Sequence, residues 1–383
     1  CRDGGDFTEH SGDAVKAGWE VKALGEVATL QRGFDLPKKN RTAGQYPLVT
    51  SSGPTDTHSE AKVSGPGVVT GRSGSIGNVF FIEDDFWPLN TALYIKDFHE
   101  NDERFVWYLL QAFDLSRFSS GAGVPTLNRN DVHGESVQIP TNIEEQKRIV
   151  AVLDAAFEGL TRARTHIETN LQNARELFGN LLDAVFTDCP DHWVKSNLGE
   201  TCKFVGGSQP PKSNFVAEPG EGLVRLVQIR DYKSDKNIVY VPRSLVRRFC
   251  SPDDVMIGRY GPPLFQILRG IDGAYNVALM KAEPDEAKVS KDFLFLFLRN
   301  SRIWRYINDA SSRAAGQIGL NKATIEPYPI AYPNMDEQKV VVKRLMEAEA
   351  DCKQAEALYK TKLIDLDDLR QSLLQKAFAG ELT

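Results

Sequence analysis

Apolar residues recur at alternating intervals of four and three positions in two long stretches of the chain. The seams formed by these apolar or small residues are Ile149, Leu153, Ala156, Leu160, Ala163, Ile167, Leu171, Ala174, Phe178, Leu181 and Val185, and then Val341, Leu345, Ala348, Cys352, Ala355, Tyr359, Leu363, Leu366, Leu373 and Ala377. No proline interrupts either stretch. Sustained heptads of this kind predict two long helices that pack as a coiled coil. Each would have about 45 residues and extend roughly 65 Å.

Both patterns start with a helix-start signal. Thr141 with Glu144, and Asn334 with Glu337, have the spacing of an N-cap and its N3 partner in a capping box. The signals predict that the long helices begin at these two places.

The segments before the long helices have shorter, mixed patterns. Strand-like runs cut by glycine and proline are followed by one helical run and a final loop and strand. The strand-like runs are YPLVTSS, GVVTG, NVFFIE, LVRLVQI, KNIVYV and FQILRG, and the helical runs are ERFVWYLLQAF and KDFLFLFLRNSRIWRYI. The aromatic residues of the helical runs have the spacing of a buried helix face, so they are predicted to pack in a core rather than to stack on bases. These aromatic residues are Phe105, Trp107, Tyr108, Phe293, Phe295 and Phe297.

The two halves of the chain repeat each other. Six stretches match in the same order, at offsets that drift from 174 to 193 and settle at 192. The matches are GWEVKALGEVATL with HWVKSNLGETCKF, VTGRSGSIGNVFFI with MIGRYGPPLFQIL, LNTALYI with YNVALMK, FVWYLL with FLFLFL, GVPTLNRNDV with GQIGLNKATI, and IPTNIEEQKRIVAVL with YPNMDEQKVVVKRL. The order indicates a duplication, and the drift indicates loops of unequal length.

Together these patterns predict the architecture. We expect two mixed α/β domains joined by two long antiparallel helices, related by an internal pseudo-twofold repeat. The predicted segments are a polar leader (1–17), a first domain (18–142), a central helix (143–188), a second domain (189–333) and a distal helix (334–383). Such an arrangement presents two related surfaces to a partner with its own local twofold, and duplex DNA is such a partner.

Composition narrows the class of protein only modestly. The net charge is −6, yet residues 190–333 carry 20 basic and 15 acidic side chains, whereas 18–142 carry 11 and 15. There is no run of eighteen apolar residues, and the five cysteines show no metal-ligand spacing. These features are typical of a cytoplasmic protein without a zinc site.

Three stretches suggest enzyme chemistry and fail on inspection. GGSQPPKS (206–213) nearly matches a P-loop, but Pro211 stands where the second glycine is needed and offers no N–H to phosphate. GPPLF (261–265) resembles the Asn/Asp-Pro-Pro-aromatic loop of amino-methyltransferases, but Gly261 has no side chain to hold the target amine. The carboxylates of PDEAK (284–288) are adjacent, and the six histidines are dispersed. No catalytic constellation is predicted.

The order of elements from Trp19 to Gly380 resembles that of the specificity subunit of type I restriction-modification systems. The resemblance rests on the duplicated order above, on RGFDLPKK (32–39), FWPLNTALYI and the closing LLQKAFAGELT, and on both copies running into a Glu-Gln-Lys helix. It implies two target-recognition domains that each read half of a split double-stranded DNA sequence in the major groove. It also implies that the helices act as a ruler and dock two methyltransferase subunits. Catalysis would lie on those subunits, which carry S-adenosylmethionine, and on ATP-driven restriction subunits that need Mg. The chain itself would be no enzyme and would hold no cofactor or metal.

Contacts to DNA are expected from polar residues on the loops of both domains, because arginine and lysine bind phosphate and polar side chains read base edges. The predicted contacts of the first domain are Arg32, Lys38, Lys39, Arg41, Arg72, Ser73, Ser75, Asn78, Asn128 and Arg129. Those of the second are Gln209, Lys212, Gln228, Arg230, Arg259, Tyr260, Gln266, Gln317, Asn321 and Lys322. For each residue a structural role in its loop is an equal alternative. Asn90 and Asn276 are predicted to be structural, and Gly71 and Gly74 to serve backbone geometry.

Two other functions stay open at this point. The chain could be a self-sufficient DNA methyltransferase or nuclease, or a coiled-coil scaffold whose domains bind protein. The target sequence, its spacer length and the methylated base are not encoded in any readable pattern.

Overall fold

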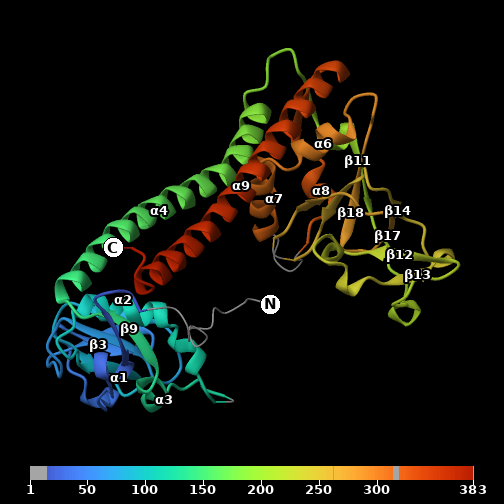
Figure 1. Cartoon of the computed structure of the whole chain (residues 1–383). Coiled ribbons are helices and arrows are strands. Elements are labelled where there is room, and N and C mark those ends of the chain that lie inside the picture. Colours follow the sequence, from blue (N-terminus) through green and yellow to red (C-terminus); the bar gives the residue numbers. More distant parts are fainter. Residues whose placement is uncertain (1–14, 122, 262, 314–318, 383) are drawn as a thin grey trace. The chain divides into compact units, whose positions relative to one another are not determined.

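The computed structural model describes residues 15–121, 123–261, 263–313 and 319–382. It divides into two units, residues 1–168 with 361–383 and residues 169–360. Both long helices contribute to both units. Helix α4 spans Ile143–Thr187 and α9 spans Met335–Phe378. Figure 1 labels some of the elements of each unit.

Unit 1 contains three sheets. The four-stranded sheet has the order β2-β8-β5-β6, with every neighbouring pair antiparallel. A three-stranded sheet has the order β4-β3-β7, and β1 pairs with β9. The strands are β1 (Trp19–Ala23), β2 (Thr29–Arg32), β3 (Tyr46–Thr50), β4 (Gly53–His58), β5 (Gly67–Gly71), β6 (Val79–Ile82), β7 (Trp87–Pro88), β8 (Ala92–Asp97) and β9 (Ser136–Pro140). The short helical elements are α1 (Leu24–Val27), η1 (Lys38–Asn40), α2 (Glu103–Phe113), η2 (Leu115–Phe118) and α3 (Arg129–His133).

Unit 2 repeats this topology with more loop structure. Its four-stranded sheets have the orders β11-β18-β15-β16 and β13-β12-β17-β14, and β10 pairs with β19. The strands are β10 (Val194–Asn197), β11 (Cys202–Gly206), β12 (Leu223–Val227), β13 (Tyr240–Pro242), β14 (Phe249–Cys250), β15 (Val255–Gly258), β16 (Gln266–Leu268), β17 (Gly273–Tyr275), β18 (Leu279–Pro284) and β19 (Pro329–Tyr332). The helical elements are α5 (Leu198–Thr201), η3 (Lys212–Asn214), η4 (Ile229–Tyr232), η5 (Asp235–Asn237), η6 (Arg243–Leu245), α6 (Lys291–Phe297), α7 (Ser301–Arg313) and α8 (Lys322–Ile325).

The strand orders confirm the internal repeat. The strands β2, β8, β5 and β6 correspond in order and direction to β11, β18, β15 and β16, and the parallel pair β3–β7 corresponds to β12–β17. The mixed α/β class predicted for both domains is therefore confirmed, although most of the strands, β2 and β11 among them, lie outside the six predicted strand-like runs.

The predicted seams lie inside the helix pair of each unit. In unit 1, Leu153 of α4 is fully buried in one cluster with Leu374 and Ala377 of α9. Arg164 there forms an ion pair with Asp367. In unit 2, Arg175 lies 3.6 Å from Glu356, measured between Nε and Oε2. Residues early in α4 thus meet residues late in α9, and the two helices are antiparallel within each unit.

Core packing follows the aromatic prediction. Phe105 of α2 and Phe293 of α6 have no exposed surface, and Tyr108 is 2% exposed. Phe297 is buried with Phe293 in the core of unit 2, and Phe295 is half-buried against that core. Phe105, Tyr108, Phe293 and Phe297 therefore stabilise the domain cores and are not available to stack on bases, whereas Trp107 and Phe295 are half-buried.

Three local predictions need correction. The residue that caps α4 is Asn142, whose side-chain oxygen accepts from the Glu144 N–H, while the Thr141 hydroxyl donates to the Gly18 carbonyl. Asn334 does cap α9, but the Glu337 carboxylate accepts from Trp193 rather than closing a capping box.

The third correction concerns the helical run of unit 2, for which the sequence pattern predicts one helix. It breaks into α6 and α7 because the buried Asn300 side chain accepts from the N–H groups of Arg302 and Ile303 and starts a new helix. Asp183 of α4 adds a second cap by accepting from the N–H of Ser301.

Candidate nucleic-acid interface

One end of the four-stranded sheet in each unit gathers four connecting segments, which we call the loop end. Strands are counted here in sheet order. The loop end consists of the segment after the first strand (β2 or β11), the turn after the third (β5 or β15), the segment before the second (β8 or β18) and the segment before the short helix (α3 or α8). In unit 1 these are 33–41, 72–78, 89–91 and 125–128, and in unit 2 their counterparts follow β11 and β15 and precede β18 and α8. Most of the predicted DNA-contacting residues lie on these segments. The others are Arg32, Arg129, Gln228, Arg230, Gln266 and Lys322, which lie outside the four segments, and Gln317, which lies outside the described residues.

The repeated Gly-Arg-x-Gly turn is held by the same main-chain hydrogen bonds in both units. The Arg72 N–H donates to the Thr91 carbonyl at 2.9 Å, and its carbonyl accepts from the Leu127 N–H at 2.8 Å. In unit 2 the Arg259 N–H donates to the Ala278 carbonyl at 2.9 Å, and its carbonyl accepts from the Leu320 N–H at 3.0 Å. The arginine backbone therefore joins three segments of the loop end in each copy.

The side chains of these two arginines form hydrogen bonds to main-chain carbonyls of their own unit. Arg72 Nε donates to the Asn90 carbonyl at 2.7 Å, and Arg259 Nε donates to the Leu320 carbonyl at 2.9 Å. Both side chains are half-buried. Each guanidinium therefore has a structural role, while the terminal N–H groups of Arg72 have no protein partner within the described part of the chain.

Gly71 and Gly74 are needed for different reasons. Gly71 lies so close to Ser75 of the turn that an added Cβ would be 1.7 Å from the Ser75 carbonyl oxygen. Gly74 has a φ of +101° and donates its N–H to the Pro125 carbonyl. Both therefore serve backbone geometry in this structure.

The serines and Asn78 of the turn differ in their accessibility. Ser73 bridges to Thr126, and the Ser75 hydroxyl lies 3.1 Å from that of Ser52. Asn78 is exposed, and its carbonyl accepts from Thr70. Asn78 therefore lies on the surface, and the partner of Ser75, Ser52, is exposed.

The segment after the first strand is a repeat that the sequence comparison missed. Gly33 and Gly207 both approach a main chain closely, with an added Cβ 2.3 Å from the Leu89 carbonyl oxygen and 2.0 Å from that of Asn276. Each segment continues through a proline-capped turn of 3₁₀ helix, Lys38–Asn40 in unit 1 and Lys212–Asn214 in unit 2. The near P-loop is thus the second copy of RGFDLPKKN.

Lysines on these turns are exposed. Lys38, Lys39 and Lys212 all lie in the exposed class, and Lys38 and Lys212 occupy the same position of the repeat. Arg41, just beyond, is more engaged: its guanidinium contacts the Leu36 carbonyl at 3.4 Å and lies 3.8 Å from Asp56.

Arg32 is part of a small polar network at the same loop end. It donates to the Asp35 carboxylate at 2.9 and 3.1 Å, and the Asn90 amide donates to Asp35 at 2.5 Å. The hydrogen bonds from Asn90 and then Arg32 lower the pKa of Asp35. The structural role predicted for Asn90 is confirmed, and Arg32 shares its charge with a carboxylate.

Asn128 and Asn321 are helix caps. The Asn128 side-chain oxygen accepts from the Asn130 N–H at 3.1 Å, and that of Asn321 accepts from the Thr324 N–H at 3.0 Å. The residues that follow, Arg129 and Lys322, begin α3 and α8 and are exposed. The caps fix where the two helices that carry these cations begin, and Arg129 also donates to the Leu30 carbonyl at 3.5 Å.

Three predicted residues of unit 2 extend along its loop end. Gln209 is exposed beside Ser208, whose N–H donates to the Tyr275 carbonyl. Tyr260 is 41% exposed and its ring lies 5.4 Å from the Arg259 guanidinium. Gln266 is half-buried and donates to the Pro263 carbonyl. Gln317 lies outside the described residues.

Gln228 follows β12 and precedes η4, and Arg230 lies on η4. The Gln228 amide nitrogen is buried without a hydrogen-bond partner among the described residues, and Asp231 accepts from the Gln228 N–H. Arg230 is exposed and donates to the Asn237 carbonyl. Burial raises the pKa of Asp231, whose side chain is fully covered.

Two arginines that the sequence patterns did not single out lie beside this loop end. Arg247 and Arg248 are exposed and line a cavity of about 380 Å³ together with Ser208 and Leu245. Their signal in the sequence is an adjacent Arg-Arg pair inside the basic segment 190–333. Unit 2 therefore has two exposed cations here in addition to those predicted.

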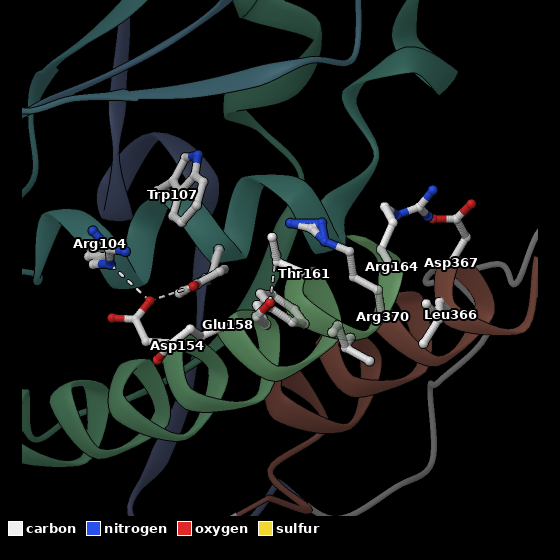
Figure 2. A pocket seen from close by; sticks show the side chains of 12 residues that line it. Arg104, Trp107, Asp154, Glu158, Thr161, Arg164, Leu366, Asp367 and Arg370 are labelled. Carbon is white, nitrogen blue, oxygen red and sulfur yellow. Dashed lines mark hydrogen bonds and ion pairs between the residues drawn. The ribbon is translucent and has the colours of Figure 1, made fainter. Parts of the chain in front are cut away.

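A second cavity, of about 820 Å³, lies in unit 1 between α2, α4 and α9. Arg104 lies over the Trp107 ring and Arg370 over the Phe157 ring in its lining, and Arg164 pairs with Asp367 (Figure 2). Within the described ranges, no group of three or more His, Cys, Asp or Glu side chains could hold a metal ion. None of the helices described is long and apolar enough to cross a membrane.

Comparison with known proteins places the chain in a family. The family described as "Type I restriction modification DNA specificity domain" matches residues 16–173 and 256–360. The match covers more than half of the chain, so the chain belongs to this family.

Curated relatives agree. The specificity subunit of the type I restriction enzyme StySPI of Salmonella potsdam is 23% identical over 293 residues, which are 70% of this chain. The EcoKI specificity subunit of Escherichia coli K12 is 24% identical over 295 residues, again 70% of this chain. Each match spans 62% of the relative's own length.

Solved structures share the fold. A chain from a study of complex assembly and conformational transition of a type I restriction-modification system has a TM-score of 0.77, with 21% identity over 97% of this chain and 100% of its own. The HsdS subunit of Thermoanaerobacter tengcongensis has a TM-score of 0.66, also with 21% identity, over 97% and 99%.

Proposed function

We propose that this chain is the DNA-recognising subunit of a type I restriction-modification complex. Each domain reads one half of a bipartite target in the major groove, and α4 with α9 sets the distance between the half-sites. The domains that do this are 18–142 and 189–333, and the helical segments are 143–188 and 334–383.

The observation that carries the proposal is the duplicated loop end. Both copies keep the main-chain hydrogen bonds around Arg72 and Arg259, and both present an exposed lysine at the same place, Lys38 and Lys212. Membership of the specificity-domain family supports the same function. A duplicated cationic surface suits a split DNA site.

The loop-end residues divide by the contacts they can make. Exposed cations at the rim suit phosphate contacts, because phosphate contacts need charge but no fixed hydrogen-bond pattern. These are Lys38, Lys39, Arg129, Lys212, Arg230, Lys322, Arg247 and Arg248. Residues with polar side chains nearer the turn suit base reading. These are Ser75, Asn78, Gln209, Tyr260 and Gln266, with the terminal N–H groups of Arg72 and Arg259.

The remaining predicted residues support the loops. Asn128 and Asn321 cap helices, Arg32 and Arg41 contact acidic or carbonyl oxygens of their own loop end, and Ser73 bridges to a neighbouring segment. They would shape the interface without reading sequence. Gln228 would join it only if its buried amide became accessible.

We assign the chemistry of the complex to other subunits. Two methyltransferase subunits that carry S-adenosylmethionine would dock on the helices, and restriction subunits that use ATP and Mg would join them in the cytoplasm.

The test is DNA binding by the full chain assembled with its methyltransferase subunits. We expect retention of a duplex that carries the target, weaker retention of a scrambled duplex, and affinity that falls steeply with salt. Equal, salt-independent behaviour toward both duplexes would remove the proposal and favour a protein-binding scaffold. DNA modified by the chain alone would instead show a self-sufficient enzyme.

A further inference from the structure

Each unit contains one buried glutamine on a long helix. Its side-chain amide forms all of its hydrogen bonds with the domain of that unit. Gln146 of α4 is 3% exposed and Gln338 of α9 is completely buried. They occupy the same position of the duplicated Glu-Gln-Lys motif, 192 residues apart. A buried primary amide needs partners for its oxygen and for both N–H groups, so its surroundings determine its orientation.

In unit 1 the amide of Gln146 joins three segments. Its oxygen accepts from the N–H of Asp102 at 2.9 Å. Its nitrogen donates to the Asn101 side-chain oxygen at 2.7 Å and to the Pro140 carbonyl at 3.2 Å. Asp102 is the residue that caps α2, and Pro140 ends β9 just before α4.

In unit 2 the amide of Gln338 repeats this pattern. Its oxygen accepts from the N–H of Ser290 at 2.9 Å, and its nitrogen donates to the carbonyls of Lys288 at 2.7 Å and Pro333 at 3.0 Å. Ser290 is the residue that caps α6, the counterpart of α2. The N–H of a capping residue is often satisfied by a glutamate of its own helix. Here a glutamine from the long helix takes that role in both copies.

The chemistry explains why glutamine stands there although acidic residues precede it. A glutamate would accept from the capping N–H equally well, but it would face the Pro140 or Pro333 carbonyl with a second acceptor and no donor. Glu144 and Glu145 precede Gln146, so the motif changes from acid to amide where the helix meets the domain.

A second attachment lies further along the same helix in each unit. In unit 1, Asp154 of α4 accepts from Arg104 Nε at 3.0 Å and from the Tyr108 hydroxyl at 2.5 Å; Figure 2 shows Arg104 of α2 facing Asp154. In unit 2, Glu349 of α9 accepts from both terminal nitrogens of Arg299 at 3.0 Å. Each long helix therefore has two attachment points on its domain. Two such points prevent the domain from rotating about either one alone.

We propose that Gln146 and Gln338 are positioning residues that fix each recognition domain on its long helix and so determine which half-site spacings the subunit accepts. This inference rests on the proposed function. Neither glutamine would touch DNA. Their loss would leave base preference within a half-site unchanged and would relax discrimination between spacings.

The experiment uses the full chain assembled with methyltransferase subunits, carrying both Gln146→Met and Gln338→Met. Methionine keeps the length and volume of the side chain but removes its hydrogen bonds. Affinity is measured for duplexes with the native spacer and with one base pair more or fewer, the target having been found by mapping methylated bases. The matched control carries Gln172→Met and Gln354→Met, which change exposed glutamines of the same two helices.

We expect the ratio of native-spacer to altered-spacer affinity to fall by about threefold or more in the double variant, because each unit loses a set of buried hydrogen bonds. The control should keep the ratio of the unchanged chain. A lower melting temperature with an unchanged ratio would overturn the inference and leave the glutamines a stabilising role alone. Should the double variant fail to fold, each single variant provides the same comparison.

Amide hydrogen exchange separates this inference from the proposed function. The N–H groups of Asp102 and Ser290 should be protected in the unchanged chain and exchange faster in the variants, whether or not DNA binds. Unprotected amides in the unchanged chain would overturn the inference even if DNA recognition holds. Protected amides in a chain that binds no specific DNA would instead show that the proposed function has failed.

Discussion

The strands β5 and β15 both end in glycine followed by arginine and have the same main-chain hydrogen bonds there, yet they differ in how tightly this glycine is packed. An added Cβ at Gly71 would be 1.7 Å from the Ser75 carbonyl oxygen, whereas at Gly258 its nearest neighbours are side-chain atoms of Gln266 and Ile229 at 3.3 Å. The duplication has therefore kept the frame that positions the arginine and allowed the tip beyond it to change. We infer that the frame serves the fold and that the tips carry the difference in sequence read.

The largest expected effect comes from the glycine that ends the strand before each turn. Gly71→Ala forces a backbone shift and should destabilise unit 1 by about 3 kcal/mol, as severe overpacking does. The matched Gly258→Ala should cost less than about 1 kcal/mol, because the side chains it meets can move. Denaturant unfolding of the two variants compares these values directly. Equal costs would show that the two turns are packed alike.

Removing the arginine of a turn should act on DNA affinity. Arg72→Ala should weaken binding of the assembled complex by about 1–3 kcal/mol and alter preference within one half-site if the terminal N–H groups read a base. Arg259→Ala should do the same for the other half-site. The measurement is a titration with duplexes altered in one half-site at a time, with melting temperature followed in parallel because both side chains also bond to carbonyls. Unchanged affinity and salt dependence would exclude Arg72 from the interface.

The attachment of α9 to its domain through Glu349 should depend on pH. The hydrogen bonds from Arg299 lower the pKa of Glu349 to about 2, from an unfolded value of 4.5. Because the folded pKa is the lower, the stabilisation is fully present above pH 4.5 and is lost as the pH falls toward 2. Glu349→Gln should therefore destabilise unit 2 by about 1–2 kcal/mol at about pH 7, a value reduced for the partial exposure of the pair.

The check on this prediction is a series of unfolding curves between about pH 7 and about pH 2. The difference between Glu349→Gln and the unchanged chain should shrink toward zero at the acid end. A difference that does not depend on pH would mean that packing, rather than charge, accounts for the loss.

The smallest effect is expected at the rim of unit 2. Replacing Arg247 and Arg248 by alanine should reduce the slope of log affinity against log salt by about one for each phosphate that is no longer bound, with no change in sequence preference. Lys203→Ala, at an exposed position of β11, provides a control for the loss of one positive charge and is compared with each single arginine variant. A change in preference without a change in slope would assign these arginines to base reading.

The parts of the fold that depend on local sequence could be predicted. Heptads located both long helices, and α2 was located by its run from Glu103 to Phe113. The parts that depend on distant partners could not. The break between α6 and α7 is capped by Asn300 and also by Asp183, which is 118 residues away, and the cap of α4 is Asn142 because Thr141 bonds Gly18 instead.

The candidate interface shows the same limit. Loop positions were found from repeated motifs, but sequence spacing could not show that Asn128 and Asn321 would use their oxygens in helix caps. The correspondence of Lys38 with Lys212 was hidden because the residues before Lys212 resemble a P-loop. The buried role of Gln146 was also invisible, because a glutamine in a polar first turn has the pattern of a solvent-exposed residue.

The central claim is that two different domains each read one half of a split DNA target. The most direct measurement is mapping of methylated bases in a host that contains the methyltransferase subunits, with and without this gene. The account predicts a methylated motif made of two short specific parts separated by a spacer of fixed length, present only when the gene is present. An identical methylation pattern with and without the gene, or a single continuous motif, would contradict it.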